Sequence, residues 1–154
     1  MGNNMNNIKL FNSINVGLAR AVAAAVEYCT DPVEEEGGCI LVSALGEFKF
    51  VKVLNYKTGT PVARGLYVAN PDAFGGEVFP ELSRGWNLYA SFHTHPTFTA
   101  TPSTLDRKEL FRGFKYNYIY SIQEKTVSYS EWSPQNDLHT IYFNLSTLNY
   151  LSNA

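Results

Sequence analysis

Residues 86–106 of the chain read WNLYASFHTHPTFTATPSTLD, and this stretch carries the clearest pattern in the sequence. It predicts a strand that ends at His95, a short loop, and a helix that begins at Ser103. Side chains on a strand alternate between its two faces, so His93 and His95 project from the same face. Two imidazoles a few ångströms apart are a natural pair of ligands for Zn²⁺.

A third ligand follows in the same stretch. Asp106 lies in the first turn of the predicted helix and could close a His₂Asp site that leaves the fourth position for water, a pattern typical of catalytic zinc. The sequence Ser103-Thr104-Leu105-Asp106 is equally a capping box, in which Ser103 and Asp106 only satisfy the first amides of the helix. The two interpretations are compatible, because a helix N-terminus aimed at the histidine pair also holds an aspartate rigidly.

The rest of the chain predicts one domain in which helices and strands are interspersed, so the fold class is α/β or α+β. We expect a flexible N-terminal segment over residues 1–12 and the folded domain over residues 13–150. The expected elements are a helix at 14–28, hairpin strands at 39–45 and 48–54, a long loop region at 58–85 with at most a short strand at 65–68, a strand at 86–95, a helix at 103–114, hairpin strands at 116–122 and 126–132, and a last strand at 140–143.

Composition excludes several classes of protein. The 154 residues are 45% hydrophobic and 17% charged, which predicts a globular domain. The formal net charge is −2 and no run of Lys and Arg is longer than Arg107-Lys108, which argues against binding of duplex nucleic acid. No apolar run approaches the roughly 18 residues that span a bilayer. The apolar stretch 16–26 contains Arg20 and makes a poor signal peptide, so we expect a cytoplasmic protein without a membrane partner.

Three further residues have side chains that can bind metals or react. His139 stands beside Asp137 in a polar stretch, and we interpret it as a surface residue. Cys29 and Cys39 permit one disulfide but do not require it, because a chain of this size builds its own core.

The pattern His93-x-His95-Pro96 followed by Ser103-x-x-Asp106 resembles the JAMM signature of JAB/MPN-domain metalloproteases, and in particular small prokaryotic or phage JAB-like domains. The segment 35–41, EEGGCIL, is similar to the glutamate and buried strand that precede the signature in that family. The resemblance covers roughly residues 22–132. It implies a cytidine-deaminase-like architecture, a mixed sheet flanked by helices.

The resemblance also implies a role for each site residue. His93, His95 and Asp106 would be ligands of a Zn²⁺ cofactor, and Glu35 would be the general base. Ser103 would donate a hydrogen bond to the tetrahedral intermediate. These roles agree with the general chemistry of zinc hydrolysis.

The position of the glutamate is open, because three acidic residues are adjacent. The spacing in the family selects Glu35 if the strand-opening glycine is Gly38, and Glu34 if it is Gly37. Neighbouring residues on an extended segment point to opposite sides, so only one of Glu34, Glu35 and Glu36 can face the metal. Without the histidine motif, the triplet would be read as a solvated acidic turn.

The function that the resemblance implies is that of a zinc-dependent amide hydrolase, a peptidase or isopeptidase. Its substrate would be a protein or peptide, such as a ubiquitin-like carrier or a cell-wall peptide. The alternative is a JAB-like zinc-binding effector or interaction module with little or no hydrolytic activity. The segment 58–85 is the expected place for substrate contacts, because loops on a rigid scaffold carry specificity.

Overall fold

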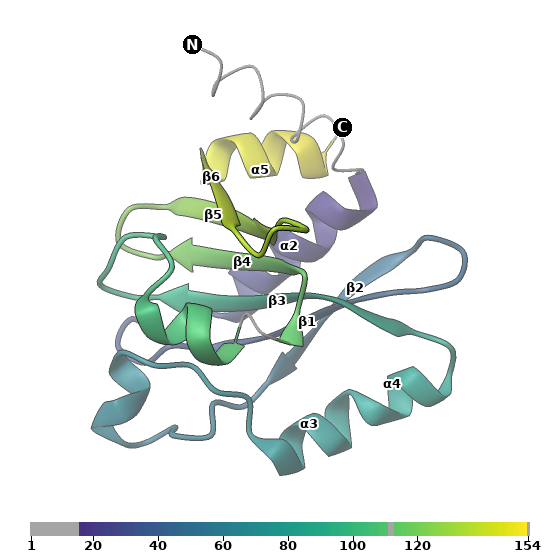
Figure 1. Ribbon diagram of the computed structural model, residues 1–154, viewed down its shortest axis with the longest axis horizontal. Coiled ribbons are helices and arrows are strands. Elements are labelled where there is room, and N and C mark those ends of the chain that lie inside the picture. Colours follow the sequence, from purple (N-terminus) through teal and green to yellow (C-terminus); the bar gives the residue numbers. More distant parts are fainter. Residues whose placement is uncertain (1–15, 111–112, 154) are drawn as a thin grey trace.

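The computed structural model describes residues 16–110 and 113–153, so the expected flexible segment 1–12 lies outside the described residues. A six-stranded sheet forms the centre of the molecule, in the order β2-β1-β3-β4-β5-β6 (Figure 1). Neighbouring strands are antiparallel except β3 and β4, which are parallel. The sheet is therefore mixed, as predicted. The strands are β1 (Gly37–Val42), β2 (Phe48–Val53), β3 (Asn87–His95), β4 (Tyr116–Ser121), β5 (Thr126–Trp132) and β6 (Leu138–Asn144).

Helices cover both faces of the sheet. One face is covered by α2 (Val16–Tyr28) and α5 (Leu145–Ser152), which pack against each other (Figure 1). Leu18, Val22 and Ala25 of α2 are buried against Phe92 and other side chains from this face, as their helical spacing predicts.

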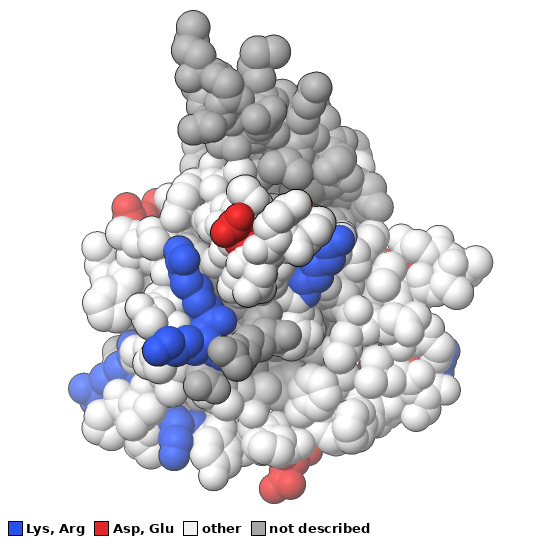
Figure 2. Space-filling model, in the orientation of Figure 1, with Lys and Arg blue, Asp and Glu red and all other residues white. Residues whose placement is uncertain are grey.

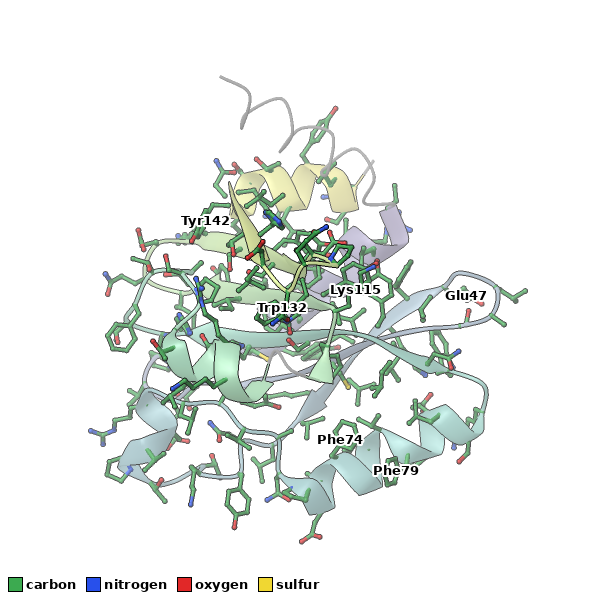
Figure 3. The ribbon with its side chains drawn as sticks, viewed as in Figure 1. Glu47, Phe74, Phe79, Lys115, Trp132 and Tyr142 are labelled. Atoms are coloured by element: carbon green, nitrogen blue, oxygen red, sulfur yellow. The ribbon has the colours of Figure 1, made fainter. Side chains whose placement is uncertain are left out.

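The other face is covered near β1 and β2 by α3 (Pro71–Glu77) and α4 (Phe79–Ser83). The rings of Phe74 and Phe79, from these two helices, pack edge to face with 5.7 Å between their centroids (Figure 3). Among the described residues, no helix is long and apolar enough to cross a membrane. Cys29 and Cys39 are both buried and free, so they do not form a disulfide.

The prediction of a long loop at 58–85 is wrong. It contains α3, α4 and the 3-10 helix η1 (Pro61–Arg64), and in place of a strand at 65–68 there is an isolated bridge between Asn55 and Ala69. All three helices have proline at their first or second position, where the absent N–H costs nothing. Asn70 caps α3 by accepting from the amides of Asp72 and Ala73. The prolines therefore begin helices here.

Two other predictions need correction. The predicted 103–114 helix starts as expected, with Ser103 as its cap and helical residues at 104–105, but it continues as a π-helix, η2 (Asp106–Leu110). The last strand is longer than predicted, and α5 follows it, capped by Asn144, which accepts from the amide of Thr147 at 2.9 Å. The short helix α5 is stabilised by its packing on α2 rather than by its length.

Candidate metal centre

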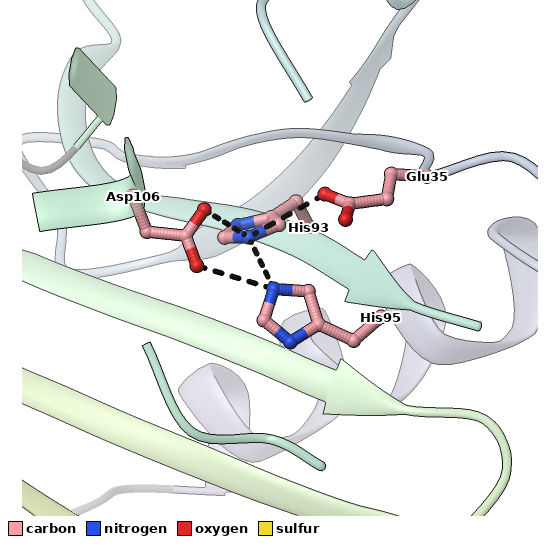
Figure 4. A group of neighbouring side chains, drawn as sticks. All are labelled: Glu35, His93, His95 and Asp106. Atoms are coloured by element: carbon pink, nitrogen blue, oxygen red, sulfur yellow. Dashed lines mark hydrogen bonds and ion pairs between the residues drawn. The ribbon is translucent and has the colours of Figure 1, made fainter. Parts of the chain in front are cut away.

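The C-terminal end of β3 places two histidines on one face of the sheet. His93 and His95 are 0% and 4% exposed, and their Nε2 atoms lie 3.2 Å apart (Figure 4). Their positions follow from the alternation of side chains along the strand, because Thr94 between them points the other way and bonds to Glu36. The structure therefore builds the pair that the sequence pattern predicts.

Asp106 reaches the same point from the other side (Figure 4). Its Oδ1 lies 3.0 Å from His93 Nε2 and its Oδ2 lies 3.1 Å from His95 Nε2. The Ser103 amide donates to Asp106 Oδ2 at 2.9 Å, and the Asp106 amide donates to Ser103 Oγ at 3.0 Å. The capping box is thus present, and it orients the aspartate toward the histidines instead of competing with that role.

Glu35 is the acidic residue of the triplet that faces the histidines. It is 2% exposed, and its Oε1 lies 3.9 Å from His93 Nε2. Its backbone is fixed on both sides, since its amide donates to the Ala63 carbonyl at 2.6 Å and its carbonyl accepts from Asn55 Nδ2 at 2.9 Å. Burial raises the pKa of Glu35 to about 8, against the opposing effect of the charge on His95.

The other two glutamates point elsewhere. The carboxylate of Glu34 accepts hydrogen bonds from the Thr58 hydroxyl and the Gly59 amide. That of Glu36 accepts from the Asp31 amide and lies 2.6 Å from Lys52 Nζ. The two sites are separate from the histidine pair, so each glutamate of the triplet has its own surroundings.

The glycine spacing alone does not decide which glutamate faces the histidines. The strand opens at Gly37, directly opposite His93, and by spacing this would select Glu34. Instead, Glu36 continues the pairing with β3, because its carbonyl accepts from the Thr94 amide at 2.8 Å. The side chain of Glu35, one residue earlier, then faces the histidines. A Cβ on Gly37 would overlap the Phe92 carbonyl oxygen and lie 2.9 Å from His93 Cβ, so this close approach requires glycine.

The donor set fits a cation. One ligand atom from each of Glu35, His93, His95 and Asp106 lies within 4.8 Å of all the others. The Nε2 atoms of His93 and His95 are 3.2 Å apart, and each lies 3.0–3.1 Å from a different carboxylate oxygen of Asp106. A tetrahedron with metal–ligand bonds of about 2.05 Å has edges of roughly 3.3 Å, close to these distances.

The protonation pattern points the same way. Nδ1 of His95 is 2.8 Å from the Thr99 carbonyl, which can only accept, so Nδ1 carries a proton; whenever the ring is neutral, Nε2 therefore presents a lone pair. That lone pair faces the Asp106 carboxylate and another imidazole nitrogen, an arrangement that a cation at the centre would stabilise. Glu35 Oε1 is buried without a hydrogen-bond partner in the described structure, which leaves it an acceptor for a water at the same centre.

The charged groups of the cluster shift one another's pKa values. Burial would raise the pKa of Asp106, but the adjacent His93 and His95 outweigh it and hold that pKa well below its usual range. Burial lowers the pKa of His93, against the pull of Asp106. For His95 the hydrogen bond to Asp106 and the charge of Glu35 overcome burial, and its pKa is raised. The aspartate is therefore ionised, as a metal ligand must be.

Several residues that the sequence did not single out support the centre. The ring of Tyr67 stacks on that of His93, with 6.1 Å between centroids, and its hydroxyl donates to the Val53 carbonyl at 2.8 Å. Asn55 is 4% exposed and joins Glu35 to the Leu66 carbonyl. These contacts come from residues far apart in the sequence, so no local pattern could have identified them.

A second supporting feature is the loop after β3, whose backbone is held in place by hydrogen bonds from side chains. Three consecutive carbonyls accept hydrogen bonds: Phe98 from the Ser121 hydroxyl at 2.6 Å, Thr99 from His95 Nδ1 at 2.8 Å, and Ala100 from the Ser128 hydroxyl at 2.6 Å. The available sequence signal was Ser121 at the end of β4 and the alternating serines of β5, Ser128 and Ser130. His139, in contrast, is exposed on β6.

Comparisons with known proteins identify the family and the fold of the chain. A family model described as prokaryotic homologs of the JAB domain matches residues 18–134. The solution structure of protein DSY2949 from Desulfitobacterium hafniense has a similar fold, with a TM-score of 0.58 and 17% identity over 78% of this chain and 82% of that one. The crystal structure of AF2198, a JAB1/MPN domain protein from Archaeoglobus fulgidus, aligns at 16% identity over 86% of this chain and 89% of that one, with a TM-score of 0.41. Comparison with curated protein sequences gives no match.

Proposed function

Since the chain belongs to the family of prokaryotic homologs of the JAB domain and brings four buried ligand-type side chains together, we propose that it is a zinc-dependent amide hydrolase acting on a protein or peptide. His93, His95 and Asp106 would hold the zinc ion. When bound, the ion supplies a Lewis acid that makes water nucleophilic near neutral pH.

One observation carries the proposal, namely the position of Glu35 relative to the three ligand atoms. The two histidine Nε2 atoms and the Asp106 carboxylate oxygens that face them are 3.0–3.2 Å apart, whereas Glu35 Oε1 is 3.9 Å from His93 Nε2. This carboxylate is therefore close to the ligands without being drawn into their contacts. A buried acceptor at this distance suits a general base better than a fourth ligand.

The chain's own residues then have separate tasks. Glu35 takes a proton from the attacking water through its unpartnered Oε1 and returns it to the departing amine. The hydroxyl of Ser103 accepts from the Asp106 amide, and its hydrogen is left to donate to the oxygen of the substrate carbonyl. Asp106 stays ionised and, with the Thr99 carbonyl, keeps His95 oriented.

The test compares Glu35→Gln with Glu34→Gln and Glu36→Gln. Because Gln has nearly the same size and shape as Glu and brings no charge into this buried position, Glu35→Gln should leave the fold and the zinc content unchanged while hydrolysis is lost. The two control variants alter hydrogen bonds at separate positions and should retain activity. The assay screens ubiquitin-like conjugates, the C-termini of carrier proteins and cell-wall peptides with the wild type first.

Two results would count against the proposal. Full activity of Glu35→Gln would remove this residue as the base. A wild-type protein that binds zinc but cleaves no substrate in any of the three classes would favour a zinc-binding module over a hydrolase.

A further inference from the structure

Exposed cations lie on two segments that contact the candidate metal centre. Arg107 and Lys108 directly follow Asp106 in η2, and both are exposed. Arg64 is the last residue of η1 and directly follows Ala63, whose carbonyl accepts from the Glu35 amide. It is exposed as well. Figure 2 shows Lys and Arg side chains gathered over the part of this face where η1 and residues 104–110 lie, with few acidic side chains among them. We call Arg64, Arg107 and Lys108 the basic rim.

The basic rim lies on a chain whose formal net charge is −2 in total. In the described part of the chain, the ion pairs of Lys and Arg lie on β2 and α4, between Lys49 and Glu81, Arg84 and Glu81, and Lys52 and Glu36. Within residues 16–110 and 113–153, the basic rim has no ion pair of its own.

The acidic side chains of residues 31–36 have partners outside the basic rim. Glu34 is engaged by Thr58 and Gly59, Glu36 pairs with Lys52, and Asp31 accepts from two backbone amides. Each of these carboxylates thus already has a partner of its own. None of them is ion-paired with Arg64, Arg107 or Lys108 in the described part of the chain, so these three cations are left to interact with a ligand.

Apolar side chains are exposed on the same segments. Val62 of η1 is 48% exposed, Phe98 of the loop after β3 is 57% exposed, and Leu105, next to Asp106, is 47% exposed. Phe98 packs the edge of its ring against His95, with 6.5 Å between centroids. Exposed apolar groups among cations are typical of a surface that binds polypeptide, whereas nucleic acid requires a larger basic area.

We propose that the basic rim, with Val62, Phe98 and Leu105, docks an acidic polypeptide segment whose apolar side chain lies beside the metal centre. Glutamate or aspartate residues on both sides of that side chain would face Arg64 on one side, and Arg107 and Lys108 on the other. The proposal rests on the proposed function, because it assigns that function an acidic substrate class.

Binding is measured by fluorescence anisotropy with the zinc-reconstituted Glu35→Gln protein, which removes turnover from the measurement. The probes are two fluorescein-labelled extended peptides with a central leucine, one flanked by glutamates and the other carrying glutamine at the same positions. Arg64→Glu, Arg107→Glu and Lys108→Glu are introduced one at a time. The control is Lys115→Glu, an exposed residue that precedes β4 (Figure 3). It lies at the end of β4 that pairs with Ala90, far from the end that pairs with His95.

We expect the glutamate peptide to bind more tightly than the glutamine peptide, with an affinity that falls as salt is added. Each reversal in the basic rim replaces an attraction of about 0.2–1 kcal/mol by a similar repulsion, which corresponds to roughly 2- to 30-fold weaker binding. Lys115→Glu makes the same change in net charge and should leave the affinity unchanged. The zinc content of every variant shows that the site is intact.

Equal binding of the two peptides, or no binding of the glutamate peptide, would overturn the proposal. An equal loss of affinity in Lys115→Glu would show that the effect depends on net charge and not on the basic rim. Tighter binding of single-stranded polyuridine would reassign the rim to nucleic acid. These results are independent of hydrolysis: an active wild type without preference for acidic peptides overturns only the docking proposal, and specific binding by an inactive wild type overturns only the hydrolase.

Discussion

Ser128→Ala should weaken both the fold and the metal site, although Ser128 touches neither the histidines nor Asp106. Its hydroxyl donates to the Ala100 carbonyl at 2.6 Å, and both residues are 0–1% exposed. Removing the hydroxyl leaves a buried carbonyl without this donor, at a cost of about 1–3 kcal/mol in the free energy of unfolding. The adjacent Thr99 carbonyl then loses part of the support that holds it against His95.

Ser130→Ala is the matched control. Ser130 is on the same strand and face and is also fully buried, but its hydroxyl pairs with that of half-buried Thr140 at 2.8 Å. Its removal should cost about 0.5–1.5 kcal/mol and leave the loop in place. The two free energies are measured by urea denaturation in EDTA, so that bound metal does not contribute.

Zinc affinity, measured by competition with a chromophoric chelator, separates the two serines. Loss of a group that orients a ligand typically costs about 10- to 100-fold in metal affinity, and Ser128 acts one step further away, so we expect a loss toward the lower end of that range. Ser130→Ala should bind zinc like the wild type. Equal zinc affinities of the two variants would refute the idea that the anchored loop positions His95.

Two further predictions follow from burial and close approach. Gly37→Ala should lower the free energy of unfolding by about 1–3 kcal/mol in urea denaturation, because the new Cβ would overlap the Phe92 carbonyl oxygen. Gly65→Ala, with open space around it, should be nearly neutral. Equal stabilities of the two variants would show that β1 can shift freely. Burial raises the pKa values of Cys29 and Cys39 to about 12, so a thiol-reactive disulfide reagent at pH 8 should label them only after denaturation, and rapid labelling of the folded protein would contradict their burial.

The central part of the fold could be predicted from local patterns. The second hairpin was expected at 116–122 and 126–132 and is found at 116–121 and 126–132, because alternating aromatic residues flank a tight turn there. The short helices between β2 and β3 could not be predicted, since Pro and Gly signal both turns and helix starts. Tertiary packing on β1 and β2 decides between the two.

The residues of the candidate site likewise divide into those that local patterns predict and one that depends on tertiary contacts. His93, His95 and Asp106 follow from alternation along one strand and from the capping box, both of which are local. The choice of Glu35 over Glu34 depends on the pairing of Glu36 with Thr94, 58 residues further along the chain. Such a contact is set by the assembled sheet, so the adjacent glutamates and glycines could not decide it.

Metal analysis of untagged protein tests the proposed centre most directly. After reconstitution with zinc and dialysis, we predict about one zinc ion per chain for the wild type and for His139→Ala, whose side chain is exposed outside the cluster. His93→Ala and Asp106→Ala should lose the ion. A wild type that retains no zinc, or an equal loss in His139→Ala, would contradict the assignment of the ligands.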